Sequence, residues 1–334
     1  YEIRPRDWSS DVCSSDLATL AAALCAVLAL PAAAQNWPTK PIRVIIPYPA
    51  GGTSDILARM IGPELTKAWG PQVIVDNRVG ANGAIAMEIT ARSPADGNTS
   101  VLNDLGNVVI SPAMYSKLPF DIIRDFTPIA MISYSAHVLA THPSVPAKNV
   151  QELIAIAKAS PGKLNVPVGL GAAVHVAALS LEQRAGVKWV YVPTKGGQAS
   201  IMTVATGEGD LLFMGMLQTM PHVRAGRLKL IAVSSEKRDP NLPNVPTVQE
   251  TPGLSGFVTG SYQGLLGPAK MPADVLNKFN AEVNRVITSP EIKEKLAAHG
   301  TVPLPMTPQE LGKWLITERD RWGKVVKASG FKID

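Results

Sequence analysis

The residues with the clearest chemical meaning in this sequence are the consecutive Gly51, Gly52 and Thr53. An apolar run over residues 42–46 precedes them, and an amphipathic segment begins at Ile56. This order predicts a buried strand, a tight turn and the N-terminus of a helix. The first N–H groups of a helix lack carbonyl partners and lie at the positive end of its dipole. The motif therefore predicts that a small anion binds here, and no nucleophile or general base accompanies it to transform that anion.

Three further glycine loops repeat this chemistry, at residues 76–84, 168–175 and 192–199. Each loop lies between an expected strand and an expected helix. In open parallel sheets such loops lie at the carboxyl ends of the strands, where ligands bind. Two of the four loops belong to the early part of the chain and two to the middle part. If two sheets face each other across a cleft, four helix N-termini meet around one ligand.

Three polar side chains near these loops each have two possible roles. Asp104 either accepts a hydrogen bond from a ligand hydroxyl, amine or protonated carboxyl, or it caps a helix. His175 starts the helix after the loop at 169–173, where it either donates to a ligand carboxylate or packs in the core. Lys195 either neutralises a carboxylate or is a solvated loop lysine. The sequence alone leaves these alternatives open.

Two tyrosines are candidates for the walls of the cleft. Tyr48 precedes the first glycine loop, and Tyr262 lies near a proposed connection between the two sheets. Amphipathic aromatic side chains suit ligand pockets because they combine an apolar ring with a polar hydroxyl. His137 lies at the other proposed connection, and we interpret it as a packing histidine.

Motifs for catalysis, metals and cofactors do not accompany the loops. The sequence contains no G-x-S-x-G, H-E-x-x-H or phosphate-binding Walker loop, and Gly169-Leu170-Gly171 does not continue as a dinucleotide fingerprint. Both cysteines, Cys13 and Cys25, precede the expected mature chain. We therefore expect no catalytic residue, no metal and no cofactor.

Composition indicates a folded protein with room for two domains. The chain has 334 residues, of which 46% are hydrophobic and 18% charged. Its net charge is +5, but the lysines and arginines are scattered and form no long basic run. Nucleic-acid binding usually requires a clustered basic face, so this class of function is disfavoured. We expect a monomer.

The N-terminal region predicts export. Residues 18–30 are apolar and rich in alanine and leucine, but too few for a membrane span, which needs roughly 20 residues. Ala32-Ala33-Ala34 before Gln35 has the form of a signal-peptidase site. We expect residues 1–17 to be a non-native leader and a signal peptide to be cleaved near Ala34/Gln35; a buried core helix is the alternative. The predicted location is the periplasm.

Strand-length apolar runs alternate with helical segments through most of the chain, which predicts an α/β fold with parallel sheets covered on both faces. The expected strands are residues 42–46, 73–75, 99–102, 129–132, 138–141, 164–168, 188–192, 210–214 and 228–233. The expected helices are residues 56–69, 150–159, 174–185, 199–206, 219–225, 273–287, 290–298 and 308–328. Pro63 predicts a kink or a late start in the first helix.

The last helices are expected to pack on the first domain, which makes that domain discontinuous. We predict lobe 1 at residues 35–137 and 262–334, and lobe 2 at residues 138–261. Two hinge strands, near residues 132–142 and 262–268, would connect the lobes.

In order and spacing, ten segments match one known family. They are residues 37–43 (WPTKPIR), 47–52 (PYPAGG), 76–81 (DNRVGA), 94–97 (PADG), 118–121 (LPFD), 125–128 (DFTP), 159–163 (ASPGK), 207–210 (GEGD), 244–247 (NVPT) and 321–326 (RWGKVV). Over residues 37–334 the chain resembles the Bug receptors of tripartite tricarboxylate transporters. The resemblance implies a type II periplasmic binding-protein fold, with two Rossmann-like lobes joined by two hinge strands. It also implies a carboxylate ligand, often a dicarboxylate, and delivery to membrane permease subunits.

The family's ligand contacts can be transferred where its motif matches, at Ala50, Gly51, Gly52 and Thr53. The chain departs from the family at residues 103–107 (NDLGN), where a small polar run is usual, and at residues 169–173, which lack hydroxyls. These departures favour a ligand with an apolar or aromatic body. The candidate ligand-binding residues are Tyr48, Ala50, Gly51, Gly52, Thr53, Asn103, Asp104, Gly169, Gly171, Ala172, Ala173, His175, Lys195, Met216 and Tyr262.

The predicted function is that of a periplasmic solute-binding receptor. It would capture a small carboxylate, either a dicarboxylate or an aromatic carboxylate, by closing its two lobes over the ligand. Two alternatives stay open. One is a sensory receptor that presents the bound ligand to a membrane kinase, and the other is an enzyme on the same two-lobed fold.

Overall fold

The computed structural model describes residues 37–298, 300–330 and 332. Lys40–Asp334 forms one compact unit. The leader and the signal peptide expected over residues 1–34 lie outside the described residues. Within the described part, no helix is both long enough and apolar enough to cross a membrane.

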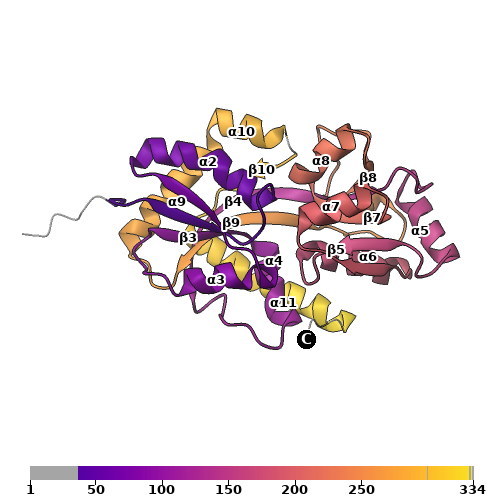
Figure 1. The fold of residues 1–334 in the computed structure, drawn as a ribbon, viewed down its shortest axis with the longest axis horizontal. Coiled ribbons are helices and arrows are strands. Elements are labelled where there is room, and N and C mark those ends of the chain that lie inside the picture. The colour runs from indigo at the N-terminus through magenta and orange to yellow at the C-terminus, as the bar shows by residue number, and fades with distance from the viewer. Residues whose placement is uncertain (1–36, 299, 331, 333–334) are drawn as a thin grey trace, which may run out of the picture. The chain divides into compact units, whose positions relative to one another are not determined.

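One side of the first sheet is parallel and the other side is antiparallel (Figure 1). Strand β1 pairs in parallel with β2 and β3, and β9 joins β3 antiparallel. Across the sheet the strands are β10 (Val302–Pro303), β4 (Phe126–Thr141), β9 (Gly260–Pro268), β3 (Thr99–Asp104), β1 (Ile42–Ile46) and β2 (Val73–Asn77). All residues of β1 except Arg43 are buried, as an apolar run between two helical layers requires.

Helices cover this sheet and begin close to the carboxyl ends of its parallel strands. α2 follows β1, the short η1 and α3 follow β2, and α4 follows β3, while the last helices return to the same sheet (Figure 1). Their bounds are α2 (Thr53–Trp69), η1 (Ala81–Gly83), α3 (Ala84–Ala91), α4 (Leu105–Met114), α9 (Ala273–Thr288), α10 (Pro290–Ala297) and α11 (Pro308–Ser329). Trp69 of α2 meets Phe279 of α9 edge to face, with ring centroids 5.1 Å apart.

The middle part of the chain forms a second group of strands and helices. β5 and β6 pair in parallel, while β7 and β8 both pair antiparallel with the end of β4. Its elements are α5 (Val150–Ala159), β5 (Asn165–Val168), α6 (Ala173–Ala185), β6 (Val190–Pro193), α7 (Gly197–Ala205), β7 (Leu211–Gly215), α8 (Met216–Arg224), β8 (Lys229–Val233) and η2 (Val248–Glu250). This group has its own buried cluster around Leu139, Trp189 and Phe213, separate from the cluster around Ile45, Met131 and Leu266.

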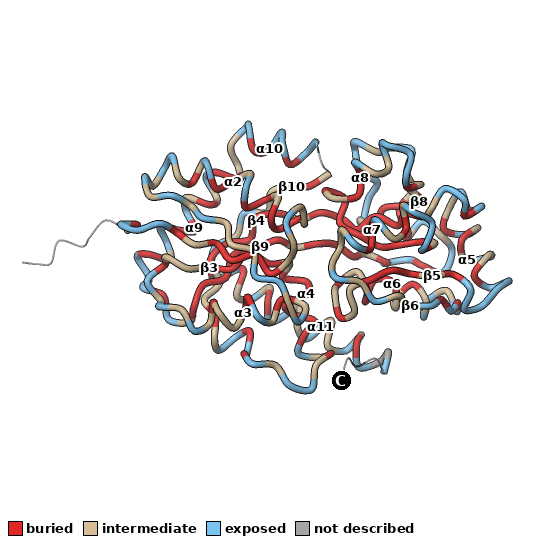
Figure 2. Tube along the Cα trace, viewed as in Figure 1, coloured by how far each residue is buried: buried red, intermediate tan, exposed pale blue. Residues whose placement is uncertain are grey.

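Strand β4 links the two groups because it changes partners along its length. Residues 126–136 pair with β9, whereas residues 137–141 pair with β7 and β8. β4 and β9 form a buried connection between the two groups of elements (Figure 2). The two-lobed α/β fold is therefore built around one continuous strand, and the exact lobe boundaries at residues 137/138 and 261/262 stay predictions.

Two details of the elements differ from the sequence-based expectation. Residues 129–132 and 138–141 form one strand, not two, because Ser133, Tyr134 and Ser135 continue the pairing with β9. Helix α2 does not start late: Gly52 is extended, the helix begins at Thr53, and it runs through Pro63.

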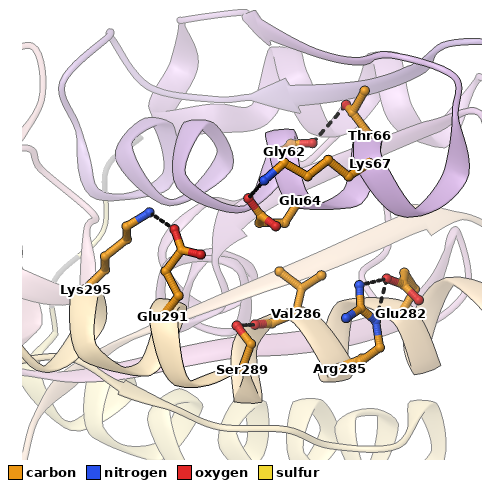
Figure 3. Close-up of polar contacts among 10 residues, drawn as sticks. All are labelled: Gly62, Glu64, Thr66, Lys67, Glu282, Arg285, Val286, Ser289, Glu291 and Lys295. Atoms are coloured by element: carbon orange, nitrogen blue, oxygen red, sulfur yellow. Dashed lines mark hydrogen bonds and ion pairs between the residues drawn. The ribbon is translucent and has the colours of Figure 1, made fainter.

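The outer surface near the end of α2 carries ion pairs within single helices, not a binding site. Figure 3 shows Lys67 with Glu64, Arg285 with Glu282 and Lys295 with Glu291. The distances are 2.7, 2.5 and 2.6 Å, respectively. Each pair is three or four residues apart and solvent-accessible, so each contributes well under about 1 kcal/mol.

A buried polar network lies where β4 changes partners. His137 Nδ1 is 3.1 Å from the hydroxyl of Thr259, and that hydroxyl donates to Ser234 Oγ at 2.9 Å. Because the only Thr259 hydroxyl proton is used there, His137 Nδ1 must be the donor, which fixes the neutral tautomer. Ser234 Oγ in turn contacts the carbonyl oxygens of His137 and Thr259. The network ties β4 to the segment that enters β9.

This network predicts a pH-dependent stability. Burial lowers the pKa of His137 to about 3, whereas an unfolded histidine titrates near 6.5. Only the unfolded chain takes up this proton as the pH falls below about 6.5, so the stabilisation is complete above that pH and is lost below it. His137→Gln removes the effect. We expect the wild type to lose roughly 1 kcal/mol per pH unit relative to this variant between pH 6.5 and 5, measured by urea unfolding.

The same comparison between pH 7.5 and 8.5 is the control, because the histidine is neutral in both states there. A difference between the two proteins that stays constant from pH 8 to 5 would contradict the assignment.

Candidate functional site

A cavity of about 480 Å³ lies between the two groups of elements, a size suited to a small ligand. The lining comes from the loop after β1, the start of α2, the loop before α3, both ends of α4, the loops before α6 and α7, the end of β7, α8 and strand β9. Its residues are Pro47, Tyr48, Pro49, Gly52, Thr53, Ser54, Val79, Gly80, Ala81, Asn82, Gly83, Asp104, Asn107, Tyr115, Gly169, Leu170, Ala172, Val174, Thr194, Lys195, Gly196, Gly197, Gln198, Met214, Gly215, Gln218, Ser261 and Gln263.

Several helices direct their N-termini at this cavity. The residues before α2, α6, α7 and α8 are Gly52, Ala172, Gly196 and Gly215, and all four line it. None of these four residues provides a side chain to cap its helix. The first-turn N–H groups of α2, α7 and α8 are therefore available to a ligand, and all four helix dipoles favour one with negative charge.

The first glycine loop is braced by a carboxylate of its own helix. Asp55 Oδ2 accepts from the Gly51 N–H at 3.0 Å, and Asp55 also bonds Arg59 and Asn77. Burial by itself would raise the pKa of Asp55, but these bonds outweigh it and hold the pKa below its usual value. The Gly52 N–H donates to the Pro49 carbonyl at 3.2 Å. The loop's open donors are thus the first-turn amides from Thr53 onward.

Backbone N–H groups of the loop before α6 likewise donate to acceptors within the protein. The Gly171 N–H donates to His175 Nδ1 at 3.2 Å, and the Ala172 N–H donates to the Gly169 carbonyl at 3.1 Å. The Ala173 N–H donates to Asn107 Oδ1 at 2.6 Å. Since three consecutive amides are engaged, a ligand here would meet the amides on either side of them, at Leu170 and Val174, which line the cavity.

The structure places the predicted site residues in two groups. Tyr48, Gly52, Thr53, Asp104, Gly169, Ala172 and Lys195 line the cavity. Ala50, Gly51, Asn103, Gly171, Ala173, His175, Met216 and Tyr262 lie outside the lining. Whether any of them contacts a ligand stays a prediction.

Packing explains why three residues of the second group, His175, Tyr262 and Met216, lie outside the lining. His175 is 0% exposed, and its ring meets Tyr191 edge to face with centroids 4.7 Å apart. Burial lowers its pKa to about 4, so the ring is neutral at pH 7 and offers no positive charge to a carboxylate. Tyr262 packs between Tyr134 and Trp314, and Met216 is buried with Val138 and Val233.

The lining includes polar side chains that sequence reasoning missed. Ser54, Asn107 and Gln198 stand beside or within the motifs already singled out, so extending those motifs by one or two residues would have found them. Gln218, Ser261 and Gln263 follow no glycine loop and carry no local signal. Ser261 and Gln263 come from β9, which reaches the cavity only because it pairs with β3.

Direct contacts cross the cavity and join the two groups of elements. Gln198 Nε2 donates to the Gly51 carbonyl at 2.9 Å. Asn107 joins α4 to α6 through the Ala173 N–H, and its Nδ2 donates to the hydroxyl of Tyr48. These contacts hold the loops together around the cavity.

Two lining residues carry formal charge. Lys195 is exposed at the edge, whereas Asp104 Oδ1 accepts from the Gly106 N–H at 2.9 Å and Asp104 Oδ2 accepts from Ser261 Oγ at 2.6 Å. Burial raises the pKa of Asp104 to about 6 despite these bonds. Among the described residues, no three histidine, cysteine, aspartate or glutamate side chains cluster as metal ligands would.

The chain matches the family model described as "Tripartite tricarboxylate transporter family receptor" over residues 57–331. It is 32% identical over 291 residues to a protein encoded in the tcbD-tcbE intergenic region of Pseudomonas sp. strain P51, covering 87% of this chain and 86% of the relative. It is 29% identical over 308 residues to Protein BugT of Bordetella pertussis, covering 92% and 94%.

Solved structures agree with these matches. Rpa4515 of R. palustris with adipate superposes with a TM-score of 0.86 at 30% identity, covering 89% of this chain and 99% of that one. MatC from Rhodopseudomonas palustris with bound malate gives a TM-score of 0.81 at 29% identity, covering 87% and 100%. The matches confirm the resemblance and the type II binding-protein fold that the sequence predicts.

The contacts across the cavity predict the effect of removing Asn107. Asn107→Ala leaves the Ala173 N–H without its acceptor and should cost about 1–3 kcal/mol of stability. It should also loosen the junction between α4 and α6, so we expect a larger radius of gyration by small-angle X-ray scattering.

Asn149→Ala is the matched control, since Asn149 caps α5 away from the cavity and its loss costs about 1 kcal/mol. Expansion in both variants, or in neither, would contradict a bridging role for Asn107.

Proposed function

We propose that this chain, which belongs to the receptor family of tripartite tricarboxylate transporters, captures a small carboxylate in the periplasm for delivery to membrane permease subunits. One observation supports the proposal above all others. The N-termini of α2, α6, α7 and α8, none of them capped by a side chain of the preceding residue, meet at one cavity of about 480 Å³. Such termini bind anions through free N–H groups and through their dipoles.

The proposed ligand is a dicarboxylate or an aromatic carboxylate. The adipate and malate in the R. palustris structures support the carboxylate part. The proposal that the body of the ligand is apolar rests on the side chains that line the cavity. They include Tyr48, Tyr115, Leu170, Val174 and Met214. A carboxylate at the helix termini would leave the rest of the molecule against these side chains.

The proposed mechanism is closure around the ligand. β4 and the entry to β9 are the hinge strands, because they connect the two groups of elements. A ligand that contacts α2 on one side and α7 on the other stabilises the closed arrangement over the open one, in proportion to the contacts that only the closed form makes. The contact of Gln198 with Gly51 adds to this preference.

A binding role without catalysis is part of the proposal. The one acid in the lining, Asp104, is half-buried and held by several donors of the protein, and His175 lies outside the lining. We further propose that the protein is exported, loses its signal peptide near Ala34/Gln35 and acts as a monomer.

A thermal-shift screen of the purified protein tests the ligand class. A carboxylate at about 100 times its dissociation constant should add roughly 2.7 kcal/mol of stability and raise the melting temperature. Mono-, di- and aromatic carboxylates are compared with a neutral sugar and an organic cation. A shift produced by the sugar or the cation but by no carboxylate would refute the proposal.

A substitution at the start of α7 tests the location. In Gly197→Ala, the new Cβ would lie 2.7 Å from Gln218 Nε2 and 3.0 Å from Met214 Sδ, so the cavity wall must shift. We expect carboxylate affinity to fall about tenfold or more, measured by calorimetry.

Gly323→Ala is the control for this substitution, since a Cβ there meets nothing within 4 Å in α11. Equal affinities of the two variants would place the ligand elsewhere.

A further inference from the structure

One wall of the cavity is a continuous chain of hydrogen bonds. Ser54 Oγ donates to Gln263 Oε1 at 2.6 Å, and Gln263 Nε2 donates to Ser261 Oγ at 2.7 Å. Ser261 Oγ then donates to Asp104 Oδ2 at 2.6 Å. All four residues line the cavity. The series of hydrogen bonds runs from the start of α2 through β9 to the start of α4.

The donor-to-acceptor direction of these hydrogen bonds determines whether this wall of the cavity presents donors or acceptors to a ligand. An ionised carboxylate only accepts hydrogen bonds, so Asp104 orients the Ser261 hydroxyl toward itself. Ser261 can then only accept from Gln263, whose amide oxygen is left to accept from Ser54. Both hydroxyl protons are consumed within the wall. The wall therefore presents acceptor atoms to the cavity, with one remaining N–H of Gln263 as the exception.

Asp104 also fills the anion position at the N-terminus of α4. Its Oδ1 accepts from the N–H groups of Gly106 at 2.9 Å and Tyr262 at 3.3 Å. Helix α4 thus carries a carboxylate at its N-cap, where a ligand anion would otherwise be held, whereas the N-cap residues of α2, α6, α7 and α8 are glycine or alanine. The cavity lining therefore combines open N–H donors with one half-buried negative charge.

We propose that Asp104 determines ligand specificity by rejecting a second carboxylate at this wall and favouring a ligand whose far end donates a hydrogen bond. The ligand class is a monocarboxylate with a distal hydroxyl, amide or ammonium group. This inference rests on the proposed function. Of the ligand classes proposed there, it excludes a dicarboxylate. A second ligand carboxylate would face Asp104 with one N–H of Gln263 as the only donor that this hydrogen-bond chain has left, and like charges brought together in a closed site cost several kcal/mol.

Matched probes test the inference on the wild-type protein. Adipate and its monoamide, adipamate, have nearly the same shape, as do terephthalate and 4-carbamoylbenzoate. Each pair differs only in whether the far end is a carboxylate or an amide donor. We expect the monoamide of the better-binding pair to bind at least about tenfold more tightly than the dicarboxylate at pH 7.5, measured by calorimetry.

Substitution of Asp104 tests which residue sets the preference. Asp104→Asn keeps the size of the side chain and removes its charge, and its Nδ2 can donate to Ser261 and release the hydroxyl proton of that serine. We expect the ratio of affinities to shift toward the dicarboxylate by about tenfold or more. Asp104→Ser, which keeps a helix-capping oxygen, should shift it in the same direction. Asp320→Asn, which removes an exposed charge of α11, is the control and should leave the ratio unchanged.

The outcomes separate the two proposals. A wild-type protein that binds carboxylates but prefers the dicarboxylate of each pair would overturn the role of Asp104 and leave the proposed function standing. A monoamide preference that persists in both Asp104 variants would assign the selectivity to another residue. That result would also overturn the proposed role of Asp104. Failure of every carboxylate to bind would overturn both proposals.

Discussion

The arrangement of the site depends on backbone N–H groups that the fold leaves without partners. Helices α2, α6, α7 and α8 all start at the cavity on residues that offer no side-chain cap. Elsewhere, Asn149 and Thr307 cap α5 and α11 in the usual way. Helices α9 and α10 also lack a side-chain cap, so what sets α2, α6, α7 and α8 apart is that the residue before each of them lines the cavity, where an anion can lie. Each side of the cavity supplies part of the set, and a ligand that satisfies both sides stabilises the closed form.

The same strand that connects the two sides also restricts how they can move. β4 pairs with β9 up to Ala136 and with β7 and β8 from His137 onward. At that point His137, Thr259 and Ser234 are joined by buried hydrogen bonds. A rotation between the two sides must bend the backbone near this network without breaking it, since buried polar groups without partners cost about 1–3 kcal/mol each. A small hinge motion of the paired strands is compatible with that restriction, whereas separation of the strands is not.

Local sequence signals predicted the fold and one part of the site. The glycine loops indicated helix N-termini, and Gly52, Ala172 and Gly196 do lie at the cavity. The signals failed where tertiary pairing decides the outcome: Ser261 and Gln263 reach the cavity from β9, more than 150 residues after Asp104 in the chain. They also failed to show which amides are already used, because the Gly171 and Ala173 N–H groups are engaged by His175 and Asn107. The residue types next to a loop predict that backbone N–H donors are present. Only the folded structure shows which of these donors have no acceptor within the protein and can bind a ligand.

Of the two roles that the sequence left open for Asp104, the structure contains the helix cap, and contact with a ligand stays a prediction. Asp104 caps α4, because its carboxylate accepts from the Gly106 N–H, and it also lines the cavity. A serine or asparagine would cap the helix about as well without the cost of burying a charge. That cost is visible in the pKa of Asp104, which burial raises to about 6 although Ser261, Tyr262 and Gly106 all donate to it. A half-buried charge that capping does not require is consistent with the proposed effect on a ligand, which in a cavity otherwise favourable to anions is discrimination between carboxylates.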